Sequence, residues 1–155
     1  MSLAVQPVPA NPMLREDAGG AARNAGPRAR AASPVETTAN GATAEWSGLA
    51  ALSAHAAAWR ALATRALEPN VFYDPAFALA AAPVFGADAG AVLVWSDSAR
   101  QHLLGVFPAR ISGAREAHAM RMLVGWTHPY APLGVPLVDR DEAGAAIRSW
   151  LGFVA

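Results

Sequence analysis

Two predicted helices are joined by the stretch Glu68-Pro69-Asn70-Val71-Phe72-Tyr73-Asp74-Pro75-Ala76-Phe77. The first helix is expected to end before Pro69, because the residue that precedes a proline avoids the α conformation. The second is expected to begin at Asp74, a good N-cap residue, with Pro75 at the first helical position, where a missing N–H costs nothing. The stretch therefore predicts a helix, a bend that exposes Phe72 and Tyr73, and a second helix.

Helical periodicity continues on both sides of this bend. Upstream, Ser53 is a candidate N-cap for a helix that runs to about Leu67. Its apolar side chains form one stripe, made of Trp59, Leu62, Ala63 and Ala66, while Arg60 and Arg65 are expected to face outward. Downstream, the second helix is expected to bury Phe77, Ala80 and Ala81 and to end at Pro83 and Gly86.

The remainder of the chain favours strands. Residues 43–49, 91–95, 102–111, 120–126 and 133–138 are expected to be strands, the second and third of them forming a hairpin. A last helix, capped by Asp139 or Asp141, is expected to bury Ala143, Ala146, Ile147, Trp150 and Leu151. The predicted order β-α-α-β-β-β-β-α indicates an α+β fold, with helices packed on a mainly antiparallel or mixed sheet.

Domain organisation is predicted from where large apolar side chains occur. Residues 1–42 are rich in proline, glycine and alanine, which predicts a disordered leader, and residues 43–155 are expected to fold as one domain. The arginines of the leader favour a solvated tail over an anion-binding arm. The last helix reaches Ala155 with no glycine cap after it, which predicts a chain truncated at its C-terminus.

Composition narrows the function classes. The chain contains no cysteine, so disulfides, thiolate metal sites and thiol nucleophiles are excluded. All 12 basic residues are arginines, and 12 acidic residues balance them, so neither nucleic acid nor an anionic membrane is indicated as a partner. No apolar run is long enough to span a bilayer, and no secretory signal is evident. We expect a cytoplasmic protein.

Four motifs in order resemble a known family. Trp59-Arg60-Ala61-Leu62-Ala63, the bend from Glu68 to Phe77, Leu103-Leu104-Gly105-Val106-Phe107-Pro108 and the segment from Gly125 to Pro136 carry the likeness. Together they resemble the GNAT-like N-acetyltransferases related to the CelD cellulose-biosynthesis proteins and the FemAB aminoacyl transferases. The match spans about residues 45–151. It implies a GNAT-like half-domain, the N-terminal portion of an enzyme that transfers an acetyl group from acetyl-CoA, or another acyl group from its CoA ester, to an amine.

The resemblance also implies partners. Such enzymes pair two GNAT-like halves, so a second half or a homo-oligomer partner is expected, together with a small-molecule, peptide or sugar amine as acceptor. The acetyl-CoA pyrophosphate is held by a glycine-containing loop at a helix N-terminus. No copy of that loop is found here. Residues 86–90 (Gly-Ala-Asp-Ala-Gly) place an aspartate where a diphosphate would lie, and they precede a strand.

The candidate site residues lie in two segments. His128 and Tyr130 are candidates for base and acid in a proline-rich loop; alternatively they hydrogen-bond locally within a rigid turn. The residues expected to line the acceptor site are Asn70, Phe72, Tyr73, Trp126, Thr127, His128 and Tyr130. In the alternative interpretation Asp74 is only a helix cap and Phe72 only fills the core.

Other chemistry is not indicated. The histidines His55, His102 and His118 lack metal-ligand spacing, and no paired carboxylates or nucleophile elbow are present. Two alternatives to the enzyme remain open. One is a non-catalytic interaction or dimerisation module, with an exposed apolar face near Trp150, Phe153 and Val154. The other is an inactive gene fragment.

Overall fold

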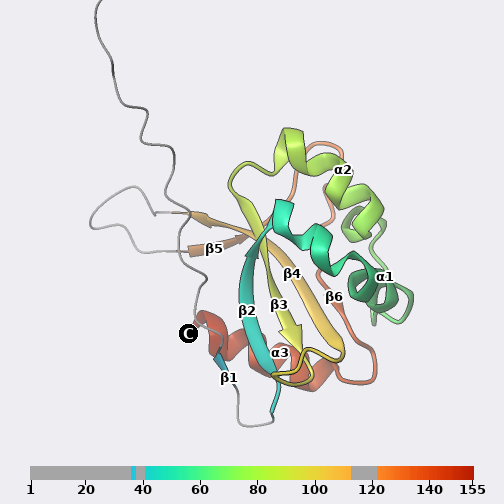
Figure 1. Ribbon diagram of the computed structural model, residues 1–155. Coiled ribbons are helices and arrows are strands. Elements are labelled where there is room, and N and C mark those ends of the chain that lie inside the picture. The colour runs from blue at the N-terminus through green and yellow to red at the C-terminus, as the bar shows by residue number, and fades with distance from the viewer. Residues whose placement is uncertain (1–35, 38–40, 113–121) are drawn as a thin grey trace, which may run out of the picture. The chain divides into compact units, whose positions relative to one another are not determined.

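The computed structural model describes residues 36–37, 41–112 and 122–155. Most of the predicted leader, and residues 120–121 of the fourth predicted strand, lie outside these ranges. The described residues form an α+β structure whose strand pairs are all antiparallel (Figure 1). The strands are β1 (Glu36–Thr37), β2 (Thr43–Gly48), β3 (Ala89–Trp95), β4 (Leu103–Ser112), β5 (Met122–Gly125) and β6 (Leu137–Val138). The α-helices are α1 (Ala56–Thr64), α2 (Pro75–Phe85) and α3 (Ala143–Val154), and two 3₁₀ segments, η1 (Leu49–His55) and η2 (Val71–Tyr73), precede α1 and α2.

The sheet separates two hydrophobic cores. Helices α1 and α2 cover one face and α3 covers the other (Figure 1). Successive residues of β3 alternate between the cores: Leu93 packs under α1 and α2, whereas Val92 and Val94 pack under α3. Every residue of β3 is therefore buried, which explains its continuous apolar sequence. The sheet also includes β1, and the α3-side core includes Ala42, both from within the range predicted as a leader.

One edge of strand β4 pairs with two different strands. Its last residues, Ala109 to Ser112, pair with β5, and Gly105 and Val106 pair with β6. Between these two pairings lies Pro108, whose carbonyl accepts a hydrogen bond from the backbone N–H of Trp126 (N···O 3.0 Å). Pro108 has no backbone N–H, so no donor is left unpaired at this position between the two pairings. β5 and β6 thus pair with different parts of β4, and no donor is exposed at Pro108 between them.

The first helix differs from its prediction at both ends. Ser53 is not an N-cap: it lies in η1, and its hydroxyl donates to the carbonyl of Ala50 (3.1 Å). The buried residues Leu49 and Leu52 are three apart, the spacing that a 3₁₀ turn aligns, so packing favours η1 over an earlier start of α1. Trp59 and Leu62 are buried as predicted. Arg65 does not face outward, because its guanidinium binds Asp139 and the carbonyl of Leu103.

The bend and α2 follow the prediction in part. The prediction that the bend exposes Phe72 and Tyr73 was wrong, because Tyr73 is 0% exposed and Phe72 is half-buried. Asp74 caps α2 by accepting the backbone N–H of Ala76 (2.8 Å), and Pro75 occupies the first turn. Two details of α2 were also wrong: Ala78 is buried while Ala80 is exposed, and the helix continues through Pro83. It ends at Phe85 with Gly86 as its C-cap, as predicted for Gly86. Pro83 is tolerated because it lies near the end of the helix, where it removes a single hydrogen bond.

Helix α3 buries a different face from the one predicted. Ala146 and Ser149 are buried and Trp150 is half-buried, whereas Ile147 and Leu151 are 42% and 50% exposed. The N-cap position is Glu142, without a side-chain hydrogen bond, instead of Asp139 or Asp141. None of the helices in the described ranges has the length and apolar character needed to cross a bilayer.

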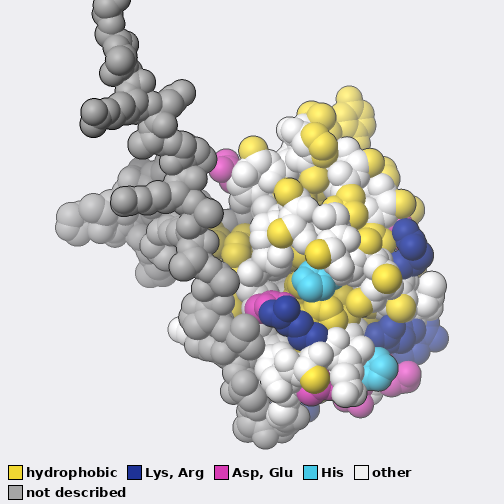
Figure 2. Space-filling view, in the orientation of Figure 1, with side chains coloured by type: hydrophobic (Ala, Val, Ile, Leu, Met, Phe, Trp, Pro, Cys, Tyr) yellow, Lys and Arg dark blue, Asp and Glu magenta, His cyan; other side chains and the backbone are white. Residues whose placement is uncertain are grey.

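The outer surface above α1 and α2 carries many apolar side chains, with charged groups gathered towards one end (Figure 2). The large ones most exposed there are Leu67, Val71 and Val84. Such scattered exposure is ordinary for a folded chain. The two hollows described below are lined by other residues.

Candidate functional site

Asn70 ties the bend between α1 and α2 to a distant segment. Its side-chain amide donates to the carbonyls of Leu133 (3.1 Å) and Val135 (2.7 Å), and its side-chain oxygen accepts the backbone N–H of Phe72 (3.1 Å). The side chain is buried, with both its oxygen and its nitrogen in use. Asn70 therefore holds the segment after residue 131 in place, and it has no free group for a substrate.

Tyr73 and Trp126 make the second tie. The Tyr73 hydroxyl donates to the Trp126 carbonyl (2.5 Å), and the two rings are nearly parallel, with centroids 6.2 Å apart. The Trp126 indole in turn donates to the carbonyl of Phe85 at the end of α2 (3.0 Å). Burial raises the pKa of Tyr73 to about 12. Both side chains are wholly buried, so they position the loop that begins at Trp126 and do not line an open surface.

Among the predicted site residues, His128 is unusual because its buried side chain makes no hydrogen bond. Its imidazole is nearly parallel to the ring of Phe85, with centroids 4.4 Å apart, and to that of Phe77, at 6.3 Å. The residue is 8% exposed, and neither ring nitrogen has a hydrogen-bond partner among the described residues. A buried polar group without a partner costs about 1–3 kcal/mol. Packing alone does not account for a histidine here, since an apolar ring would fill the same space.

His128 is the first residue of a tight turn. Its backbone N–H donates to the carbonyl of Ala131 (3.3 Å), and the N–H of Ala131 donates back to the carbonyl of His128 (2.8 Å). Pro129 and Tyr130 form the tip, where Tyr130 is 71% exposed. The alternative expectation, that His128 hydrogen-bonds locally, holds for its backbone and not for its side chain.

The structure thus brings the two predicted segments together and divides the predicted residues by role. Buried groups that hold the loop are Asn70, Tyr73 and Trp126. Phe72 is half-buried and meets Phe77 edge to face, at 5.5 Å between centroids. Thr127 and Tyr130 are exposed, whereas His128, between them in the chain, is buried. Proton exchange with a ligand is therefore the chemistry that His128 offers, once a ligand reaches its ring.

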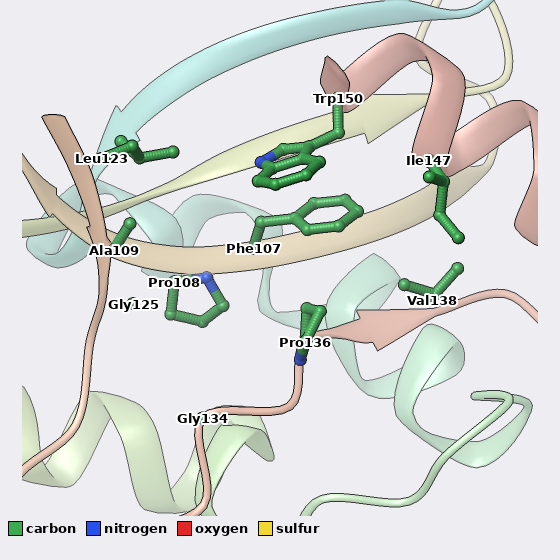
Figure 3. Close-up of a pocket in the computed structure, with 10 residues that line it drawn as sticks. All are labelled: Phe107, Pro108, Ala109, Leu123, Gly125, Gly134, Pro136, Val138, Ile147 and Trp150. Carbon is green, nitrogen blue, oxygen red and sulfur yellow. The ribbon is translucent and has the colours of Figure 1, made fainter. Parts of the chain in front are cut away.

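An apolar cleft that was not predicted lies on the opposite face of the sheet, below α3. Its volume is about 400 Å³, and it lies between the part of β4 that pairs with β5 and the part that pairs with β6 (Figure 3). The lining residues are Phe107, Pro108, Ala109, Leu123, Gly125, Gly134, Pro136, Val138, Ile147 and Trp150. They come from four separate segments, so periodicity within one segment gives no signal. The small residues Ala109 and Gly125 are the only local hint.

A second, polar hollow of about 450 Å³ lies near the start of α3. Its floor holds the Arg65–Asp139 ion pair (Nε···Oδ2 2.5 Å), and Asp139 also accepts the backbone N–H of Asp141 (2.9 Å). Burial alone would raise the pKa of Asp139, but the hydrogen bond and charge of Arg65, with the backbone N–H groups, hold that pKa below its ordinary value. Asp139 is thereby fully used in joining α1 to α3.

The residues described here do not fit the pyrophosphate of acetyl-CoA. The segment before α3 carries three acidic residues, Asp139, Asp141 and Glu142, which repel a diphosphate at that helix N-terminus. The glycines of the 86–90 turn are explained by packing. A Cβ on Gly86 would meet the Ala82 carbonyl at 2.7 Å, and one on Gly90 would meet the Trp46 ring at 2.4 Å.

Within residues 36–37, 41–112 and 122–155, no three His, Asp or Glu side chains are grouped so that they could hold a metal ion. No family model matches the chain, and neither does any curated protein or solved structure with which it was compared. The family resemblance therefore rests on the sequence motifs alone.

Proposed function

We propose that this chain is the acceptor-side part of an acyl-CoA-dependent N-acyltransferase, with a GNAT-like half-domain fold and a cytoplasmic location. The observation that supports this most is the meeting of the two predicted site segments. The inter-helix bend and the loop from Trp126 are joined by the bonds of Asn70 and Tyr73, and they surround His128. The acyl-CoA would be held by a second GNAT-like half or a partner chain, since the residues described here do not fit its pyrophosphate.

In this proposal His128 acts on the amine. An ammonium group must lose a proton before its nitrogen can attack a carbonyl, and a free imidazole nitrogen accepts that proton. The ring is nearly enclosed, so the 128–131 turn has to open to admit the amine. Tyr130 at the tip of that turn would then lie beside the bound acceptor. The ring nitrogens of His128 have no hydrogen-bond partner in the free protein, and the bound amine would supply one.

The test is to titrate ¹⁵N-labelled protein with amines from three classes: amino acids, amino sugars and short peptides. We expect one class to shift the His128 imidazole signals and the amide signals of residues 126–131. His128→Phe should abolish that binding, and the control His102→Phe, at an exposed histidine elsewhere, should retain it. Acetyl-CoA should not bind this chain alone. The proposal fails if no class binds, or if His128→Phe binds its amine as tightly as the control does.

A second candidate, an interaction module, is favoured by one observation on α3. Ile147, Leu151 and Val154 are 42%, 50% and 41% exposed and lie at helical spacing on one side of α3. This apolar stripe replaces the predicted one, because Trp150 and Phe153 pack against the sheet. Sedimentation combined with the amine titration would distinguish the candidates: a module predicts a stable dimer that Leu151→Glu disrupts, and no amine binding at His128.

A further inference from the structure

The apolar cleft below α3 is hollow because its floor is made of small residues. Ala109 of β4 and Gly125 of β5 are directly paired, so their side-chain positions are on the same face of the sheet. The next pair on the same face, Ile111 and Leu123, is large, and so is Phe107, two residues before Ala109 on that face. A Cβ added to Gly125 would have no heavy atom within 4 Å. The position therefore points into open space.

The walls of the cleft are uncharged. Phe107 and Trp150 are stacked one over the other, with centroids 5.1 Å apart and an interplanar angle of 11° (Figure 3). Val138 and Ile147 lie on one side of this pair and Leu123 on the other. The prolines Pro108 and Pro136 contribute no backbone N–H. Apart from the unpaired indole N–H of Trp150, these side chains offer no partner to a charged or strongly polar ligand, so complementarity favours a hydrocarbon.

One end of the cleft reaches the acceptor loop. Gly134 lines the cleft, and a Cβ on Gly134 would lie 3.2 Å from the Thr127 methyl group. Thr127 precedes His128 directly, and Gly125, on the cleft floor, precedes Trp126. A ligand that lies along the cleft with its head group at Gly134 therefore presents that head group to the loop that carries His128.

We propose that the cleft binds the hydrocarbon chain of an acyl group, with the carbonyl end at Gly134 and Thr127. The volume of about 400 Å³ is within the range of small-molecule sites, about 300–1,000 Å³. It is a concave hollow, whereas a stable protein partner needs a broad surface. The choice of an acyl chain among hydrocarbons rests on the proposed function. It makes the enzyme selective for acyl groups longer than acetyl.

The experiment titrates the full chain with hexanoate, octanoate and decanoate, followed by calorimetry. We expect one saturable site, with affinity rising about fourfold for each added methylene. Gly125→Val places a side chain in the hollow, and Gly48→Val is its control at a strand glycine that also has free space around it. The cleft variant should bind decanoate at least tenfold more weakly, and the control should match the wild type.

A second pair keeps the test valid if Gly125→Val does not fold. Ile147→Glu places a carboxylate at the rim of the cleft, and Leu151→Glu makes the same change one turn along α3, outside the lining. Only Ile147→Glu should weaken decanoate binding. The proposal is overturned if decanoate shows no saturable site, if both glutamate variants bind alike, or if both instead dissociate a dimer, which would make this face a protein interface.

The outcomes separate this inference from the proposed function. His128→Phe lies outside the cleft and should leave decanoate binding unchanged. If decanoate binds as expected and no amine does, the acyl site stands and the acceptor role of His128 fails. If an amine binds at His128 and decanoate does not bind, only the acyl site fails.

Discussion

The two faces of the sheet are built in different ways. On the α1/α2 face, two helices and a loop cover the sheet, and long-range hydrogen bonds from Asn70, Tyr73 and Trp126 hold that loop. On the α3 face a single helix covers the sheet, and β5 and β6 pair with different parts of β4. The first face is closed around one unpaired imidazole, and the second is left with an open apolar cleft.

The contrast shows two ways in which a fold prepares a site. The closed face positions a polar group by surrounding it with rigid contacts, at a cost in unsatisfied hydrogen bonding. The open face leaves a hollow by placing small residues opposite each other in a sheet. The closed face should therefore be sensitive to substitution, whereas the open face should tolerate it.

The largest effect is expected from one leucine of each face. Leu62 of α1 is 0% exposed and Leu151 of α3 is 50% exposed, and both are in helices, where alanine is well accepted. Leu62→Ala should lower the free energy of unfolding by about 2–5 kcal/mol, because it leaves a cavity. Leu151→Ala should change it by less than about 0.5 kcal/mol. Urea denaturation measures both, and equal losses would contradict the contrast.

Tyr73 should make the closed face sensitive to alkali. Its pKa is raised by burial from 10.0 to about 12, so in the unfolded chain the phenol ionises at a lower pH than in the fold. Stability should therefore fall as pH rises from about 10 to 12, by about 2–3 kcal/mol. Tyr73→Phe should remove this fall and cost about 1 kcal/mol at neutral pH, since the Trp126 carbonyl loses its donor. Identical alkaline unfolding in both proteins would show that Tyr73 is not the group responsible.

Asp139 should make the junction of α1 and α3 sensitive to acid. Its pKa is held below the ordinary value, so the stability that it contributes is present above about pH 4 and is lost as pH falls below that value. The loss should be about 1 kcal/mol, because the Arg65 side chain is 33% exposed and water screens the pair. Asp139→Asn should lack this part of the acid unfolding curve. If the variant keeps it, other carboxylates dominate.

His128→Phe is expected to have the smallest effect on stability and the opposite sign. Phenylalanine fills nearly the same space and has no unpaired nitrogens, so stability should stay equal or rise by up to about 1 kcal/mol. Amine binding should be lost, which is the pattern of a residue kept for function. Thermal unfolding measures the change. A loss of more than about 1 kcal/mol would mean that the imidazole is hydrogen-bonded after all.

Local chemistry made the bend predictable from the sequence. Asp74 and Pro75 act through atoms two residues away, and they define the start of α2 whatever the remainder of the chain does. The tie made by Asn70 reaches carbonyls 63 and 65 residues along the chain. Nothing in its neighbourhood specifies those partners, so its role as an anchor could not be predicted.

The α3 face was harder to predict for a different reason. The helix is rich in alanine and glycine, so several faces are nearly equally apolar, and the pattern placed Ile147 and Leu151 inward. The face that is buried depends on the volume left by the sheet, which accepts Ala146 and Ser149. The cleft likewise exists only because four separate segments meet. Sequence periodicity describes one element at a time and cannot report such a hollow.

The central claim, that the two faces hold separate sites, is tested most directly by the indole N–H spectrum of ¹⁵N-labelled protein during a decanoate titration. Trp150 lines the cleft, and its indole N–H has no partner within the described residues. Trp126 lies on the other face of the sheet, where its indole N–H donates to the Phe85 carbonyl. Decanoate should shift the Trp150 signal and leave the Trp126 signal in place. Shifts of both signals together, or of Trp126 alone, would contradict the account.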